Sequence, residues 1–200
     1  MLSAQPATLD HVLQRFNDAW RAAKADPAIR HQGAVCLSTV DGHGFPNARF
    51  VDLKAATAEG FVFCTALDAP KAAELAHCPR AALTVWWEPL GVQIRVQGTA
   101  TRLDRARAKP WWQSRPREAQ LATLCSQQSQ PLESMEQLRQ RRAALRASLE
   151  GADIPIPDHW GAFTIAPVSV EFLNFQEDRL HRRERFWQRD GRWAVELLQP

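Results

Sequence analysis

The spacing of apolar residues divides the chain into one leading helix followed by many short strands. Across Thr8–Asp26, apolar residues recur at helical intervals, as Val12, Phe16 and Trp20 do, and Pro27 lies just beyond. This spacing predicts an amphipathic helix that ends before the proline. Downstream, the runs become short and rich in Val, Phe and Thr, with turn residues between them. They predict strands over residues 33–40, 46–54 and 60–65.

A second hairpin and a group of C-terminal strands follow. Residues 80–87 and 91–103 are predicted to pair around a turn at 88–90. Within 91–103, apolar and polar residues alternate from Val92 to Gln97, which is typical of a strand with one buried face. Four more strand-like runs close the chain: GAFTIAP, VSVEFLNF, DRLHRRERF and GRWAVELL.

Two further segments have the composition of helices. One is a short helix over residues 71–76, with Asp68 expected as its N-cap and Pro70 in its first turn. The other is the charged segment 104–150, for which Gly151 is expected to cap the C-terminus. Its last helix carries an apolar stripe, interpreted as a core or dimer contact: Met135, Leu138, Leu145 and Leu149.

Antiparallel strands at short spacing, interrupted by helices, favour a mainly β fold of the α+β class. We expect a small antiparallel barrel of six to eight strands, and 200 residues suffice for one such domain. Residues 1–31 are expected to hold the N-terminal helix, 104–151 a helical insertion, and 159–200 the C-terminal strands.

Composition and charge narrow the classes of function. Hydrophobic residues make up 45% and charged residues 24% of the chain, as in an ordinary globular protein. A net charge of +3 is too small to indicate nucleic-acid binding by itself. The four cysteines show no C-x-x-C pairing, so we expect reduced thiols in a cytoplasmic protein rather than a metal site.

One short stretch near the C-terminus, EDRLHRRERF (177–186), concentrates positive charge. A solvated basic tail is the simplest interpretation of such a run. Its cations at alternate positions, however, share one parity: Arg179, His181, Arg183 and Arg185. In an extended chain they project from one face, while Leu180 and Phe186 project from the other. This alternation favours a strand that presents cations to an anionic ligand.

Other cationic and amide side chains lie beside predicted turns and helix starts. Lys71 stands in the first turn of a short helix, where backbone N–H groups also favour an anion. Further candidates of this kind are Arg49, Lys54, Arg115, Arg117, Gln128 and Ser129. Arginine and lysine in such places are typical phosphate ligands, although a solvated surface charge is the alternative for each taken alone.

Eight short motifs, in this order, span most of the chain: RFVDLK, GFVFCT, PRAAL, QIRVQGTATRL, SRPRE, HWGAF, VEF and RLH-x-R. Together they resemble the pyridoxamine 5'-phosphate oxidase family. The resemblance implies an FMN-binding split barrel that works as a homodimer, with residues 159–200 completing the interfacial flavin site. It also implies oxidation of the 4' carbon of pyridoxamine or pyridoxine phosphate, hydride transfer to flavin N5, and reoxidation by oxygen.

The resemblance assigns roles to individual residues. Arg49 and Lys71 match positions that hold the FMN phosphate. Other flavin-contacting positions match Phe50, Val51, Asp52, Leu53, Lys54, Cys64, Thr65, Gln93, Gln128, Ser129 and Arg183. Positions that bind the substrate phosphate match Lys54, Trp111 and Arg115. Arg179 and His181 match the catalytic pair that flanks the substrate ring.

Several positions depart from the family pattern. The replacements are Ala69 and Pro70 for a serine-arginine pair, Cys64 and Trp111 for tyrosines, Ala119 for a serine, Leu173 for a tryptophan and Arg182 for an aspartate. Two of about four contacts to the substrate phosphate are thereby lost, each worth roughly 1.5–3 kcal/mol.

The sequence therefore leaves two classes of function open. The first is an FMN-dependent oxidase of pyridoxamine phosphate, or of another flat ring as in phenazine-forming relatives. The second is a flavin-binding split-barrel protein with little oxidase activity. A nucleic-acid module is a distant third, because the basic residues are spread over strands without an aromatic RNA-binding signature.

Overall fold

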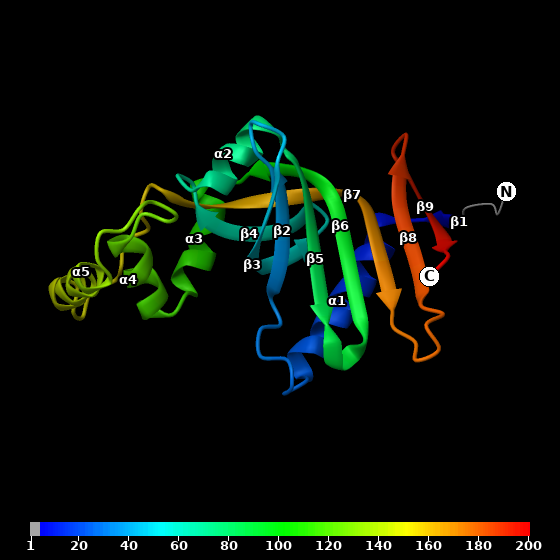
Figure 1. Cartoon of the computed structure of the whole chain (residues 1–200), viewed down its shortest axis with the longest axis horizontal. Coiled ribbons are helices and arrows are strands. Elements are labelled where there is room, and N and C mark those ends of the chain that lie inside the picture. Colours follow the sequence, from blue (N-terminus) through cyan, green and yellow to red (C-terminus); the bar gives the residue numbers. More distant parts are fainter. Residues whose placement is uncertain (1–4) are drawn as a thin grey trace.

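Antiparallel strands form the body of the computed structural model, which describes residues 5–200 (Figure 1). The strand order is β1-β9-β8-β7-β4-β3-β2-β5-β6, and β6 also pairs with β7, so six strands close into a barrel. The strands are β1 Gln5–Ala7, β2 Ala34–Val40, β3 Pro46–Thr57, β4 Gly60–Ala66, β5 Arg80–Trp87, β6 Val92–Arg102, β7 Trp160–Asn174, β8 Arg182–Arg189 and β9 Arg192–Leu198. The predicted antiparallel barrel is confirmed, with β1, β8 and β9 added outside it.

Strand β7 is shared by the barrel and the C-terminal strands. Its residues 160–165 pair with β4, residues 169–174 pair with β8, and β6 pairs along both parts. The prediction of two separate strands, GAFTIAP and VSVEFLNF, is therefore wrong. Pro167 lies where β7 passes from β4 to β8, so its missing N–H interrupts neither of those two ladders.

The helices are α1 Leu9–Ala25, α2 Pro70–His77, α3 Arg105–Gln113, α4 Arg117–Cys125 and α5 Met135–Ser148, with a 3-10 turn at Glu88–Leu90. The Thr8 side chain caps α1, which packs its buried face, including Phe16, against the barrel. At α2 the predicted cap is wrong: Ala69, not Asp68, holds the N-cap position, and no side chain bonds there. No helix within residues 5–200 is long and apolar enough to cross a membrane.

Helices α3, α4 and α5 extend from one end of the barrel, away from β8 and β9 (Figure 1). Trp112 of α3 and Trp160 of β7 stack edge to face at 5.0 Å in a small second core. The predicted core contact of the apolar stripe is confirmed in part: Leu145 and Leu149 are partly buried and pack against the second core. At the other end of the stripe Met135 is 54% exposed.

Candidate functional site

A cavity of about 640 Å³ opens between strands β3 and β4, helices α2 and α4, and the start of β7. Nine predicted site residues line it: Arg49, Phe50, Val51, Cys64, Thr65, Lys71, Arg115, Gln128 and Ser129. Pro70 and Ala119, two of the departures from the family pattern, line it as well. This volume is typical of a site for a cofactor-sized ligand.

Arg49 is held in the cavity by a buried carboxylate. Its Nη2 lies 2.9 Å from Oε2 of Glu74, and its Nη1 donates to the Thr39 hydroxyl. Glu74, which is 7% exposed, also accepts from Thr39 and, at 2.9 Å, from Asn47. A carboxylate with this many donors is anchored, so it fixes the direction of the Arg49 guanidinium.

Lys71 stands one helical turn before Glu74, at the start of α2. Its Nζ donates to Oε1 of Gln128 at 2.8 Å, and the residue is 7% exposed. Burial lowers the pKa of Lys71, and the nearby positive charge of Arg49 lowers it further. These two effects outweigh the negative charges of Glu74 and Asp68, so an added anion beside the ammonium would be favourable.

Arg115 brings a third cation to the cavity from the loop before α4. Its Nη2 donates to the Ala119 carbonyl and the Thr123 hydroxyl, both at 3.2 Å, but its buried Nε has no partner in residues 5–200. Burial lowers its pKa. Because Glu74 is the one carboxylate bonded to these three cations in the described chain, the cavity fits an anionic group such as a phosphate.

Two further residues define the chemistry of the cavity wall. Burial raises the pKa of Cys64 to about 12, so its thiol stays neutral and is not a nucleophile at physiological pH. Ser129 adopts a left-handed backbone conformation, with φ of 70°, beside Gln128. Such a conformation is costly for a non-glycine residue and is concentrated at binding sites.

Eight predicted residues lie outside the cavity lining, and four of them belong to β3 and α3. Leu53 is buried in the barrel core, and Trp111 packs against the second core. Lys54 forms an ion pair with Asp52, at 2.5 Å from Nζ to Oδ2. Its positive charge lies near enough to Cys64 to lower the pKa of that thiol slightly.

The remaining predicted residues gather at the opposite end of β7. Gln93, Leu173 and Arg183 are register neighbours across β6, β7 and β8. Strand β7 has 15 residues. With a rise of about 3.3 Å per residue, its two ends lie up to about 46 Å apart along the strand. Figure 1 shows the same separation, with α4 at one end of the molecule and β8 at the other. The chain thus carries its candidate residues in two separate groups.

Arg179 and His181 precede β8 instead of lying in it. The prediction of one continuous strand face from Arg179 to Arg185 is wrong, because Arg179 takes a left-handed φ of 67° and the strand begins at Arg182. Leu180 is 68% exposed, whereas Phe186 is buried as expected. The His181 ring lies 4.1 Å from the Phe175 ring, and its Nδ1 accepts from the Gln176 N–H at 3.1 Å.

Sequence reasoning missed several residues that build the cavity: Thr39, Glu74, Ala122, Thr123, Ser126, His159 and Trp160. Glu74 had a signal, since an acidic residue one turn after Lys71 on a short helix suggests a partner for buried cations. The others reach the cavity only through tertiary packing.

Acid is expected to destabilise the fold through two carboxylates, the buried Glu171 and the partly buried Glu184. Burial would raise the pKa of each, but hydrogen bonds and charge from arginines bring both pKa values below the ordinary 4.5. The unfolded chain therefore binds more protons than the folded one just below pH 4.5. Their stabilising contribution is complete above that pH and is lost as the pH falls through the lower folded values.

Denaturant unfolding at a series of pH values between about 6 and 3 measures this loss. In Glu184→Gln the slope of unfolding free energy against pH is expected to flatten, because one of the two groups no longer titrates. An unchanged slope in that variant contradicts the assignment.

Comparison with known proteins finds matching family profiles and relatives. The family profile described as "Pyridoxamine 5'-phosphate oxidase" matches residues 22–149, and one described as "Pyridoxine 5'-phosphate oxidase C-terminal dimerisation region" matches residues 160–200. A Myxococcus xanthus (strain DK1622) protein named pyridoxine/pyridoxamine 5'-phosphate oxidase is 39% identical over 94% of this chain and 91% of its own. A Zymomonas mobilis protein of the same name is 38% identical over 92% of this chain and 94% of its own.

Solved structures show the same fold. PhzG from Burkholderia lata 383, in complex with tetrahydrophenazine-1-carboxylic acid, superposes with a TM-score of 0.88 at 28% identity, covering 98% of this chain and 94% of that one. A pyridoxamine 5'-phosphate oxidase-related, FMN binding protein from Nostoc punctiforme gives 0.75 at 17% identity, covering 92% and 96%. With these profiles, relatives and fold, the chain belongs to the pyridoxamine 5'-phosphate oxidase family.

Proposed function

We propose that this protein is an FMN-dependent oxidase that holds the flavin phosphate between Arg49 and Lys71. The observation that carries the proposal is the cation-rich cavity, in which Lys71 is buried and an added anion would be favourable. A phosphate there supplies that negative charge and accepts charge-assisted hydrogen bonds from both side chains. Gln128 and Ser129 stand beside them and add polar contacts.

The proposed working unit is a homodimer whose two chains share each flavin site. Two facts support it: the match to a C-terminal dimerisation region, and the position of Gln93 and Arg183 at the far end of β7 from the cavity. A second copy, placed so that its β6–β8 end faces the cavity, brings the two groups together. Exposed Phe50 and Trp86 are then available for burial at that interface.

In this site FMN, when bound, supplies the acceptor for hydride from the substrate. Gln93 and Arg183 offer N–H donors and positive charge that stabilise the reduced, anionic flavin. Arg115 attracts an anionic group of the substrate, while Arg179 and His181 flank the ring to be oxidised. The substrate we propose is pyridoxamine or pyridoxine 5'-phosphate, in a cytoplasmic protein that makes pyridoxal phosphate.

A second candidate is oxidation of a phenazine-type ring. The likeness to PhzG favours it, and so does the loss of substrate-phosphate contacts at Trp111 and Ala119. Under this alternative Arg115 pairs with a ring carboxylate instead of a phosphate.

The test is a visible absorption spectrum of the purified protein, followed by anaerobic addition of candidate substrates. Oxidase function predicts a bound flavin whose absorption bleaches with pyridoxamine or pyridoxine phosphate, or with a reduced phenazine carboxylate for the alternative. A flavin that binds but bleaches with none of them identifies a flavin-binding protein without this oxidase activity.

The altered phosphate site predicts a raised Michaelis constant for pyridoxamine phosphate. Ala119 lines the cavity beside Arg115, so Ala119→Ser adds a hydroxyl where the phosphate is expected. Combined with Trp111→Tyr, it should lower the Michaelis constant about tenfold or more, with little change in turnover number, since such contacts act equally in ground and transition states. A wild-type enzyme that already saturates at micromolar substrate contradicts this expectation.

A further inference from the structure

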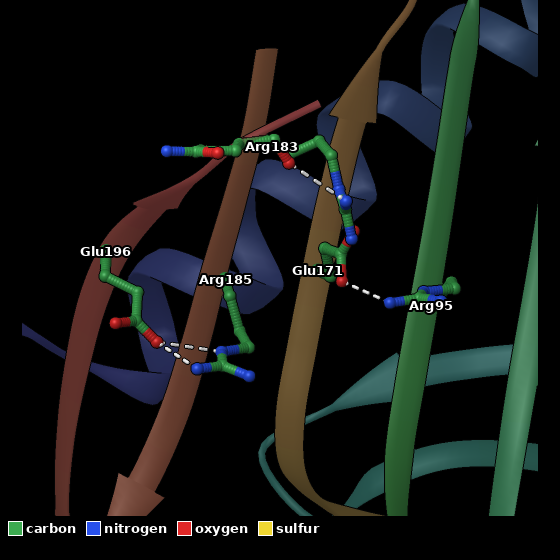
Figure 2. Close-up of polar contacts among 6 residues, drawn as sticks. Arg95, Glu171, Arg183, Arg185 and Glu196 are labelled. Carbon is green, nitrogen blue, oxygen red and sulfur yellow. Dashed lines mark hydrogen bonds and ion pairs between the residues drawn. The ribbon is translucent and has the colours of Figure 1, made fainter. Parts of the chain in front are cut away.

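Glu171 of β7 is a buried carboxylate that joins two arginines of neighbouring strands (Figure 2). Its Oε1 accepts from Nε of Arg183 at 2.9 Å and also lies 2.9 Å from Nη2 of that residue, in an ion pair. Its Oε2 accepts from Arg95 of β6. The Arg183 Nη1 donates to the Gln199 carbonyl at 3.0 Å, so two of the three guanidinium nitrogens donate hydrogen bonds and the third lies in the ion pair.

The charges of this group do not cancel. Glu171 is 4% exposed, and burial would raise its pKa, but its two arginine partners bring the pKa below the ordinary value, so it is ionised at neutral pH. Two guanidinium groups and one carboxylate leave a net charge of +1. The Arg183–Glu171 pair alone would be neutral. The net positive charge of the group therefore comes from Arg95.

The neighbouring residue of the same parity on β8, Arg185, forms an ion pair whose charges do cancel. Arg185, two residues beyond Arg183 on β8, places both Nε and Nη2 on Oε1 of Glu196 (Figure 2). This pair consists of one cation and one anion, and both side chains are partly exposed. It is a neutral surface pair, which is worth little in binding or stability.

We propose that Glu171 and Arg95 are positioning residues for Arg183: Glu171 fixes its orientation, and Arg95 offsets the carboxylate so that Arg183 keeps a positive field toward the ligand. The inference rests on the proposed flavin site, in which Arg183 faces the bound cofactor. A fixed, oriented positive charge stabilises reduced flavin more than oxidised flavin, because negative charge develops on reduction.

The test is Arg95→Gln, which retains a donor for Glu171 but removes the charge. Arg95 is half exposed, so the fold should persist, as thermal unfolding will verify. The expected result is oxidised FMN bound as in the wild type and reduced FMN bound about tenfold more weakly, which equals a midpoint potential about 30 mV lower for a two-electron couple. Arg95→Lys should restore the potential, and Arg185→Gln should leave it unchanged.

Three outcomes overturn the inference: an unshifted potential in Arg95→Gln, an equal shift in Arg185→Gln, or no restoration by Arg95→Lys. If the wild-type protein binds no FMN, the proposed function fails together with the inference. If the wild type binds FMN and only the potential of Arg95→Gln stays unshifted, the proposed function stands and the inference alone fails.

Discussion

Replacing Arg49 and Lys71 together by alanine is expected to release FMN from the protein. Each side chain offers a charged hydrogen bond to the proposed phosphate, worth roughly 1.5–3 kcal/mol, so the pair accounts for about a hundredfold to ten-thousandfold in affinity. The variant should purify colourless, and its dissociation constant, measured by quenching of FMN fluorescence, should rise by that factor.

The double variant needs a control with the same loss of charge. Lys109→Ala combined with Arg141→Ala removes two exposed cations of the helical extension, outside the cavity lining. FMN affinity should be unchanged there, since exposed charges far from the ligand act weakly. Similar losses in both double variants would mean that general electrostatic attraction, and not a phosphate clamp, retains the flavin.

Replacing Arg179 or His181 by alanine is expected to lower the turnover number about a hundredfold. We propose that these residues hold the reacting carbon against the flavin, and small displacements of a reacting group are costly in rate. The Michaelis constant should change less, which separates this effect from that of Ala119→Ser. Steady-state kinetics of both variants provides the measurement.

Arg182→Ala is the matched control for the loop. Arg182 neighbours His181, is 64% exposed at its side chain and pairs with Glu184. Turnover should stay close to the wild-type value in this variant. An equal loss in Arg182→Ala would point to a general disturbance of the loop rather than to contacts with the substrate.

The barrel was predictable from the sequence because its strands carry local signals. Alternation in β6, turn residues between strands, and the capped amphipathic helix α1 each depend on neighbouring residues alone. The joining of two runs into β7 was not predictable, because it depends on a change of partner strand at Pro167. The alternation of residues wrongly predicted that Arg179 shares a strand face with Arg183, for a similar reason. Arg179 has a left-handed backbone conformation before β8, which interrupts the extended chain.

For the candidate site, motif resemblance found the cations but not what holds them. Arg49 and Lys71 stand in recognisable motifs, whereas Glu74 and Glu171 act through contacts between elements distant in sequence. The division of the site residues into two groups could not be predicted either. Gln93 and Lys71 are only 22 positions apart in the sequence, but the fold places Gln93 beside the end of β7 and Lys71 in the cavity near its start.

Subunit complementation tests the shared site most directly. One chain carries Arg49→Ala and Lys71→Ala, the other Arg179→Ala, and the two are unfolded together and refolded as a mixture. Random pairing makes about half of the dimers mixed, and each mixed dimer has one intact site of two, so about a quarter of wild-type turnover should return. If each site lies within one chain, no intact site forms, and turnover no higher than the mean of the two separate variants would contradict the account.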